Sequence, residues 1–292
     1  MAIGETTSGS LATALPEIVG DARVVHEEEG TWRRTCDVKR QTPNTGLNWS
    51  EFALDQLARQ DITETTDNRN YQQLSGTLLS VEPQMTQIII KMTDRMARKI
   101  ASVVKDKFGS LAGNAMARGD DEDYLAMFST FGTGASPGSG QPLSFGHISA
   151  AVNRIQSNVT ETSKAEVSSV LHGYQVKDVQ DEVLAGIGTY TIPVGLTEET
   201  FRKGFAGTVA GSNVYVDGNI EVTATPNARG AVHSREAVVA AIGLEIKKET
   251  DRDMYFGGGA DVISLTNEHA FVERSAGNWA YTILSDATAP TS

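Results

Sequence analysis

Residues 77–108 read TLLSVEPQMTQIIIKMTDRMARKIASVVKDKF, and this stretch decides the fold. Its first half predicts two strands, 77–81 and 85–92, because aliphatic and β-branched residues gather on either side of a proline that a central strand cannot hold. Thr93 is then a suitable N-cap for a helix. Apolar residues recur at helical spacing along one face of that helix, at Met96, Ile100, Val103 or Val104, and Phe108.

The opposite face of this predicted helix is basic. Five cations lie within it, at Arg95, Arg98, Lys99, Lys105 and Lys107. Asp106 is the single acid among them once Asp94, in the first turn, is set aside. Such a basic stripe is either a solvated helix face or a surface that meets a polyanion or an acidic segment of a neighbouring chain, such as residues 27–29.

Toward the N-terminus the chain has no evident core of its own. Residues 1–31 are small and polar with scattered apolar positions, which predicts an arm. Residues 31–76 are rich in Thr, Asn and Gln and carry two isolated aromatic residues, Trp49 and Phe52. A connection of this length is unusual in a compact domain unless it reaches something else, so we expect a two-stranded excursion that protrudes from the body.

Beyond the long helix the sequence predicts a mixed region of strands and helices. The acids of 120–123 open a further helical run that reaches Phe131, and we expect them to be solvated at its N-terminal end. Ser144 caps another helix, which ends near Asn158. Strands are expected at 167–171, 187–194, 213–216, 220–224, 262–265, 269–274 and 279–284. Helices are expected at 172–184, 198–205 and 234–244.

Composition limits the classes of protein. The 292 residues are 39% hydrophobic and 21% charged, enough for a large core. The net charge of −12 argues against a dedicated reader of duplex DNA, although it leaves room for a local basic face. The single cysteine, Cys36, excludes an intramolecular disulfide framework. The N-terminus resembles no signal peptide and the aliphatic cluster at 88–90 is too short for a bilayer, so we expect no membrane association.

No constellation of catalytic residues stands out. The acidic run 120–123 lacks the ligand spacing of an EF-hand, and the glycine-rich segment 132–140 follows a helix, which favours a linker over a phosphate loop. Cys36 follows Arg33 and Arg34, which favour a thiolate, but a lone cysteine without a motif is weak evidence for catalysis. The histidines lack metal or hydrolase spacing and are expected on the surface or hydrogen-bonded in the core: His26, His147, His172, His233 and His269. We therefore expect no enzyme activity, no metal and no cofactor.

The order of these elements resembles that of the major capsid proteins of tailed bacteriophages, which have the Hong Kong 97-type fold. The segments that carry the resemblance are 48–52, 61–67, 77–81, 88–94, 169–172, 213–217, 231–237 and 278–288. The resemblance covers nearly the whole chain and implies an α+β fold in four parts. These parts are an N-terminal arm (1–33), an extended E-loop (34–76), a peripheral domain (77–157 and 261–288) with a spine helix at about 94–118, and an axial domain (158–260).

This resemblance implies that many copies assemble, as pentamers and hexamers, into the icosahedral head of a phage around double-stranded DNA, inside the cytoplasm of a bacterial host. The arm and the E-loop would lie across neighbouring subunits. The residues expected at these contacts are Glu27, Glu28, Glu29, Arg33, Arg34, Trp49 and Phe52. For the two aromatic residues, packing against their own peripheral domain is the alternative. The basic stripe would lie on the inner face and touch DNA without sequence specificity.

The resemblance also implies other partners. A separate scaffolding protein is expected because the chain begins with a short arm, together with a portal and, in some relatives, decoration proteins. Some relatives form a covalent cross-link from an E-loop lysine; Lys39 is close to the start of the excursion, but no motif identifies its partner and we expect no cross-link. Two other functions stay open, namely an encapsulin-type shell that holds cargo enzymes and a monomeric α+β enzyme.

Overall fold

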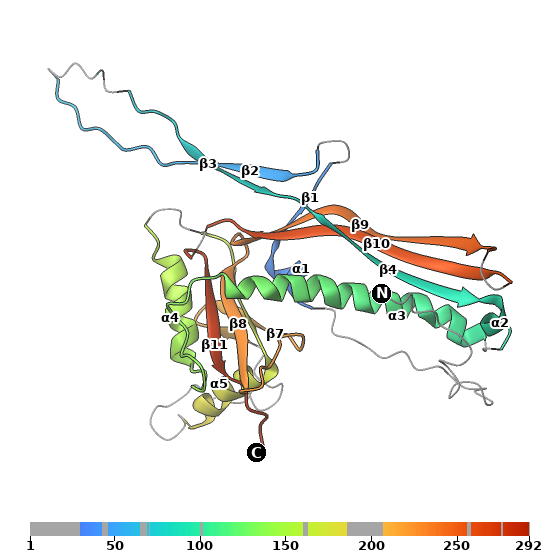
Figure 1. The fold of residues 1–292 in the computed structure, drawn as a ribbon. Coiled ribbons are helices and arrows are strands. Elements are labelled where there is room, and N and C mark those ends of the chain that lie inside the picture. Colours follow the sequence, from blue (N-terminus) through green and yellow to red (C-terminus); the bar gives the residue numbers. More distant parts are fainter. Residues whose placement is uncertain are drawn as a thin grey trace.

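The computed structural model describes residues 30–42, 46–64, 69, 71–99, 102–159, 163–185, 207–255, 258–275 and 277–291. The helices are α1 (Trp32–Thr35), α2 (Asp94–Ala97), α3 (Ser102–Ala126), the 3-10 helix η2 (Met127–Ser129), α4 (Phe145–Gln156) and α5 (Gly173–Ala185). The strands are β1 (Asp37–Arg40), β2 (Trp49–Leu54), β3 (Gly76–Val81), β4 (Gln84–Thr93), β5 (Val167–Leu171), β6 (Thr208–Val209), β7 (Ser212–Val216), β8 (Asn227–Ser234), β9 (Val238–Asp253), β10 (Ala260–Glu273) and β11 (Ala280–Asp286). They form a long sheet, a shorter sheet and a projecting pair of strands (Figure 1).

The long sheet has the strand order β1-β9-β10-β4, and α3 lies along one of its faces (Figure 1). β9, β10 and β4 are antiparallel neighbours, while β1 runs parallel to the start of β9. Alternate side chains of β4 and β10 face the helix because side chains in a strand alternate between its two faces. The residues packed there are Ile88, Ile90, Ile263 and Leu265 of the strands and Ala112 and Met116 of α3.

The strands and the helix start predicted from residues 77–108 are confirmed. β3 and β4 occupy the two expected positions, with Glu82 and Pro83 between them. Thr93 caps α2, and its hydroxyl oxygen accepts a hydrogen bond from the Met96 backbone nitrogen at 3.3 Å. Helix α2 ends at Ala97 and α3 begins at Ser102, so the predicted helix is divided into two.

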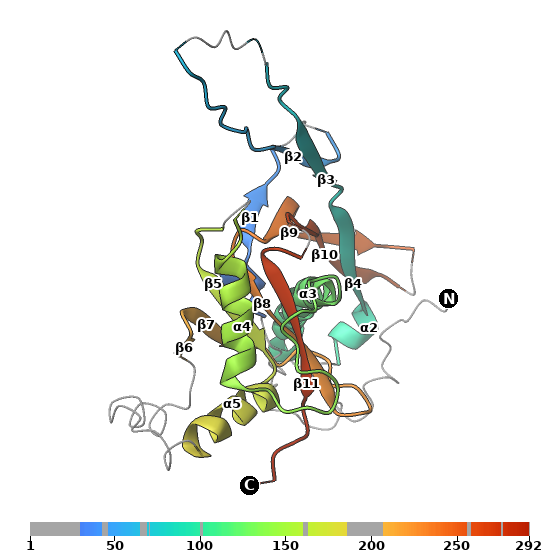
Figure 2. The ribbon, with the colours of Figure 1, turned by 90° about the vertical axis from the view of Figure 1, so that its left-hand side faces the viewer.

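The shorter sheet has the order β11-β8-β5-β7-β6, with α4 packed beside it (Figures 1 and 2). Ser144 caps α4 as predicted: its side chain bonds the His147 backbone, and the Ser144 backbone nitrogen donates to Nδ1 of His147 at 3.3 Å. The buried face of α4 carries Ile148, Ala151, Val152 and Ile155. β5, α5, β7 and β11 also lie within a few residues of their predicted positions.

A shared core joins the two sheets around α1 and the C-terminal half of α3. Trp32 of α1 packs edge-on against Phe271 of β10, with ring centroids 5.5 Å apart. Tyr124 of α3 packs in the same way on Phe128, at 5.0 Å. Both aromatic pairs belong to one buried cluster that includes residues of β8 and β9. The cluster therefore fixes the arrangement of the sheets relative to each other.

Three predictions for the second half of the chain are wrong. The helix expected at 234–244 is instead the end of β8 and the start of β9, because a buried run of apolar residues such as 238–242 fits a central strand as well as a helix. The two strands expected at 262–265 and 269–274 are one strand, β10, with register shifts between Thr266 and His269. The segment 220–224 forms a single bridge, from Val222 to Ala228, and no strand. The strand expected at 187–194 and the helix expected at 198–205 lie outside the described residues.

The acids of 120–123 are also placed differently from the prediction. They lie inside α3, which continues to Ala126, and Asp120 and Asp121 are buried. The buried positions of this part of α3 and η2 recur every four residues, at Ala112, Met116, Asp120, Tyr124 and Phe128. The helix therefore keeps one buried face through the acidic run, and two of its carboxyl groups face inward with polar partners.

The sheets do not follow the expected domain boundaries everywhere. β9 belongs to the long sheet, although 238–253 lies in the segment expected as axial domain. β11 pairs with β8 in the shorter sheet, although 280–286 lies in the segment expected as peripheral domain.

A two-stranded antiparallel ribbon does project, but not with the predicted bounds of 31–76: β3 begins only at the end of that segment, and α1 and β1 within it belong to the body. β2 and β3 pair from Trp49 opposite Val81 to Leu54 opposite Gly76. This projecting ribbon extends away from both sheets in two perpendicular views (Figures 1 and 2).

Buried polar groups in the shared core are paired with one another. The Tyr124 hydroxyl lies 2.6 Å from Nε2 of His233, and Nδ1 of His233 lies 3.0 Å from the Ser234 carbonyl oxygen. Because a carbonyl oxygen only accepts hydrogen bonds, Nδ1 carries the proton and Nε2 accepts from the tyrosine. Burial lowers the pKa of His233 to about 4, so the imidazole is neutral near pH 7.

Replacing Tyr124 by Phe therefore leaves a buried acceptor, Nε2 of His233, without its donor. We expect the free energy of unfolding to fall by about 1–3 kcal/mol, measured by urea denaturation at pH 7. The matched control is Tyr281→Phe, since among the described residues no hydrogen bond involves that hydroxyl and its removal should cost much less. An equal loss of unfolding free energy in both variants would contradict the buried hydrogen bond from Tyr124 to His233.

Candidate functional site

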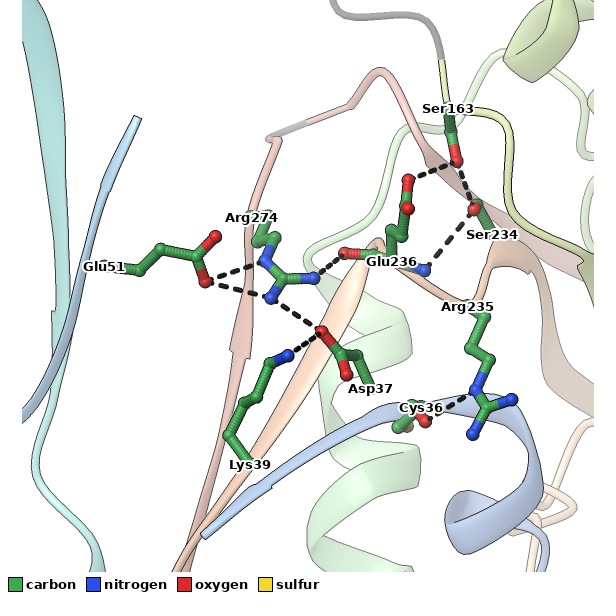
Figure 3. Close-up of polar contacts among 9 residues, drawn as sticks. All are labelled: Cys36, Asp37, Lys39, Glu51, Ser163, Ser234, Arg235, Glu236 and Arg274. Carbon is green, nitrogen blue, oxygen red and sulfur yellow. Dashed lines mark hydrogen bonds and ion pairs between the residues drawn. The ribbon is translucent and has the colours of Figure 1, made fainter. Parts of the chain in front are cut away.

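Arg274 joins the projecting ribbon to the body of the molecule (Figure 3). Its Nε and Nη2 atoms donate to Oε2 of Glu51, on β2, at 3.0 and 2.9 Å. Nη2 also donates to Oδ2 of Asp37, on β1, at 2.7 Å, and Nη1 donates to the Glu236 carbonyl oxygen at 3.0 Å. One guanidinium group therefore holds three segments that are distant in sequence.

The charges around Arg274 balance. Its side chain is only 14% exposed, and Asp37 also lies 3.2 Å from Nζ of Lys39, so two cations meet two carboxylates. Burial acts against ionisation of Asp37, but hydrogen bonds from Arg274 and Lys39 hold its pKa below the ordinary value. Burial likewise acts to lower the pKa of Arg274, while Glu51 and Asp37 raise it. Each charge in the cluster therefore has a partner of opposite sign.

The turn between β8 and β9 supplies the backbone acceptor for Arg274 and is itself held in place (Figure 3). The hydroxyl groups of Ser163 and Ser234 are hydrogen-bonded, and Ser163 donates to Oε2 of Glu236 at 3.1 Å. Nε of Arg235 donates to the Cys36 carbonyl oxygen at 3.4 Å. These contacts fix the base on which the ribbon is mounted.

The projecting ribbon exposes an apolar face. Side chains alternate along β2, so Glu51 turns toward Arg274 while Phe52 and Leu54 turn away. Phe52, Leu54 and Leu78, which lies opposite Phe52 on β3, are 58, 66 and 63% exposed. Further along the excursion, other large apolar side chains are also exposed, at Leu57, Ile62, Tyr71 and Leu74. A monomeric protein in water rarely exposes so many apolar side chains on one element.

The Phe52 ring lies across the start of β3. A side-chain carbon at Gly76 would be 2.6 Å from the ring of Phe52 and 2.4 Å from the carbonyl oxygen of Ala53. The ring therefore occupies a defined position, and only glycine leaves room for it. Trp49 lies on the same face of β2 as Glu51 and is half-buried, so the two aromatic residues predicted as contacts occupy opposite faces of the ribbon.

The other predicted contact residues lie at the root of the arm. Glu27, Glu28 and Glu29 are outside the described residues. The Arg33 guanidinium lies 4.5 Å over the Trp32 ring, and its Nη2 is 3.9 Å from Oε2 of Glu245. The last of them, Arg34, is exposed on α1.

The predicted basic stripe is spread over two helices and the turn between them. Arg95, Arg98 and Lys99 are exposed at α2 and directly after it, and Nε of Arg98 donates to the Asp94 carbonyl oxygen at 3.3 Å. Lys107 is half-buried on α3, and the side chain of Lys105 lies outside the described part of the chain. The predicted basic residues are therefore divided between α2, the two residues after it, and α3.

In the part of the chain that the structure describes, the candidate catalytic and metal-binding groups lie apart from one another. No three histidine, cysteine, aspartate or glutamate side chains among the described residues are placed to hold a metal ion. Burial strongly raises the pKa of Cys36, so the nearby arginines do not produce a thiolate. A groove of about 760 Å³ between α3 and the β7–β8 connection has two glutamates and an arginine in its lining, at Glu122, Glu221 and Arg229. None of the described helices is long and apolar enough to cross a membrane.

Sequence reasoning missed Arg274 and the inward-facing acids of α3. Nothing local identifies Arg274, because its partners Glu51 and Asp37 are more than 200 positions away. For Asp120, the sequence did hold a signal. Apolar residues at Ala112, Met116, Tyr124 and Phe128 follow a spacing of four, and Asp120 occupies the position between Met116 and Tyr124.

The fold is shared with solved phage structures, whereas no protein-family model and no curated protein matches the sequence. A structure of Mycobacterium phage Che8 matches with a TM-score of 0.70 and 13% identity, over 94% of this chain and 98% of the other. The capsid asymmetric unit of cyanophage Pam1 matches with a TM-score of 0.70 and 9% identity, over 99% and 100%. The capsid of Ralstonia phage GP4 matches with a TM-score of 0.69 and 12% identity, over 94% and 96%.

The chain therefore has the fold of tailed-phage capsid proteins. The Hong Kong 97-type α+β fold predicted from the sequence is confirmed.

Replacing Arg274 by Met leaves Asp37 and Glu51 partly buried with their shared partner removed. We expect a loss of stability on the order of 3 kcal/mol and faster amide exchange in β2 and β3. Glu51→Gln, which keeps the shape but removes one charge, should raise exchange in the ribbon alone. The control is Asp61→Asn, because the Arg59–Asp61 pair is almost fully exposed and contributes little. Unchanged exchange in both Arg274→Met and Glu51→Gln would show that the ribbon is held by other contacts.

Proposed function

We propose that this protein is the major capsid protein of a tailed bacteriophage, which assembles into the icosahedral head around double-stranded DNA. The supporting observation is that the fold is shared with phage capsid structures over 94% or more of the chain. The match therefore extends over all four proposed parts. The role is structural, with the shell assembled in the cytoplasm of a bacterial host. Four parts serve this role: the arm, the E-loop, a peripheral domain on the long sheet and an axial domain on the shorter sheet.

The exposed face of the projecting ribbon is the proposed contact with a neighbouring copy. Its three apolar side chains, Phe52, Leu54 and Leu78, lie on a ribbon that a partly buried ion-pair cluster holds at its base. Burial of apolar surface contributes a favourable free energy of about 25 cal/mol per Å². Repeated over many copies, this contribution favours a closed shell. Trp49 contributes from the inner face of the ribbon. The arm residues Glu27, Glu28, Glu29, Arg33 and Arg34 complete the contact between subunits.

The basic side chains near α2 are the proposed contact with packaged DNA. Arg95, Arg98 and Lys99 are exposed, and Lys105 and Lys107 follow on α3. These contacts bind phosphate without sequence specificity, and the net charge of −12 keeps the overall attraction weak enough for packaging and ejection. A scaffolding protein, a portal and decoration proteins are the further proposed partners.

The experiment is negative-stain microscopy with size-exclusion chromatography, on protein expressed alone and with its neighbouring genes. Closed icosahedral shells, or rings of five or six copies, are expected. Shells that contain protein cargo and no DNA would favour the encapsulin-type function instead. A strictly monomeric species at high concentration under both conditions would overturn the proposal.

Replacing Phe52 by Asp should prevent assembly without unfolding the chain. The side chain is 58% exposed in the single subunit, so we expect an unchanged circular dichroism spectrum and thermal midpoint but no shells in the microscope. The control is Val159→Asp, which places the same charge at an apolar side chain that is 93% exposed and lies outside the ribbon. Normal shells from Phe52→Asp would contradict the role of this face.

We also expect no covalent cross-link through Lys39. Its Nζ atom lies 3.2 Å from Oδ2 of Asp37, inside the cluster around Arg274, and is therefore engaged within its own chain. Denaturing electrophoresis of mature particles should show one band at the mass of the single chain, about 31.2 kDa. A ladder of larger species would contradict this expectation.

A further inference from the structure

The root of the N-terminal arm crosses α3 at a single fixed point. Gly30 has a φ of +76°, and a side-chain carbon at this position would lie 2.1 Å from Cγ of Asp121. The backbone therefore passes directly over this carboxyl group, which only glycine permits. The next residue, Thr31, is buried and begins the segment that leads into α1.

Thr31 is held between two buried carboxyl groups from different parts of the fold. Its backbone nitrogen donates to Oδ1 of Asp121, on α3, at 3.1 Å. Its hydroxyl group donates to Oδ2 of Asp217, directly after β7, at 3.0 Å. Asn219 bonds the same two groups: Nδ2 donates to Oδ2 of Asp121 and the backbone nitrogen donates to Oδ1 of Asp217, both at 2.9 Å. All four carboxyl oxygens therefore have a donor, and every donor is neutral.

Among the described residues, this pair of carboxyl groups forms no ion pair with a positive charge. The titratable groups of the packed elements that interact electrostatically with it are Cys36, Tyr124 and His172, whereas Asp120 and Arg235 are bonded to other partners. Burial raises the pKa of both Cys36 and Tyr124 and lowers that of His172, so all three are neutral at pH 7. Asp120 is buried and accepts a bond from Asn267, and Arg235 donates to the Cys36 carbonyl oxygen.

Two facing carboxylates in a buried site are costly unless they share a proton. Both aspartates have no exposed surface. Burial raises the pKa of Asp121 to about 6, with the neighbouring Asp217 acting in the same direction. This pKa lies above the ordinary value of 3.8, so the stabilisation is complete below about pH 4 and is lost as the pH rises through about 6.

We propose that Asp121 and Asp217 form a proton-controlled anchor for the N-terminal arm. When the pair shares one proton, it holds Thr31 between α3 and the β7–β8 connection. When that proton leaves, two buried negative charges face each other and the root of the arm is released. Acidification therefore tightens the arm, and neutral to alkaline pH loosens it. The anchor is a property of the folded subunit and does not depend on what the assembled protein encloses.

Amide hydrogen exchange of the purified chain tests this anchor. Protection of the peptide that covers residues 30–41, corrected for the intrinsic pH dependence of exchange, should fall at least tenfold between pH 5 and pH 8. Asp217→Asn removes the carboxylate that faces Asp121 and should keep the peptide protected across this range. Thr31→Val removes the hydroxyl donor and should lower protection at pH 5.

The matched control is Glu122→Gln, which removes a largely exposed acid next to Asp121 and should leave the pH dependence unchanged. A second readout needs no variant of the pair: the infrared band of a protonated carboxyl group should titrate near pH 6 in the unmodified chain. Constant protection in the unmodified chain, or equal pH dependence in Asp217→Asn, would overturn the proposal. If the chain forms no shells but shows the expected pH-dependent exchange, the result counts against the proposed function and not against the anchor.

Discussion

The rest of the structure depends on the buried aromatic cluster around Tyr124. There the C-terminal half of α3 meets α1, β8 and β10, so a single core fixes two sheets and the start of the described chain. The cluster also carries polar groups, and it tolerates them because the Tyr124 hydroxyl and His233 satisfy each other. A helix that supported only one sheet would leave the other free to move, and the projecting ribbon would have no stable base.

Two polar clusters extend this core outward, and both hold the segment 30–40. Thr31 is bonded by Asp121 and Asp217, and Asp37 is bonded by Arg274. The first site has an excess of acidic groups, whereas the acidic and basic groups of the second site are balanced. A short segment, which contributes Trp32 and Cys36 to the shared core, therefore links the root of the arm to the base of the ribbon.

Much of the fold could be predicted from sequence because its signals are local. The proline between β3 and β4, the Thr93 cap and the Ser144 cap each act within a few residues. The run 238–242 misled the prediction because a strand buried on both faces has no alternating pattern. The partners of Arg274 and of Asp121 could not be predicted, since pairs such as Glu51 and Arg274 are brought together only by the complete topology.

Strand β10 has a mechanical consequence. Near the first residues of β10, Arg252 of β9 binds Asp94 of α2 and Asp261 of β10. This contact attaches α2 to the adjacent ends of β9 and β10. The last residue of β10 precedes Arg274, which holds the ribbon. At about 3.3 Å per residue, the 14 residues of β10 span roughly 45 Å; they pair with β9 as far as Glu273 and with β4 from Ala260 to His269. The strand is therefore a rigid connection between the two ends of the sheet. A force applied to the ribbon by a neighbouring molecule is transmitted along β10 to α2.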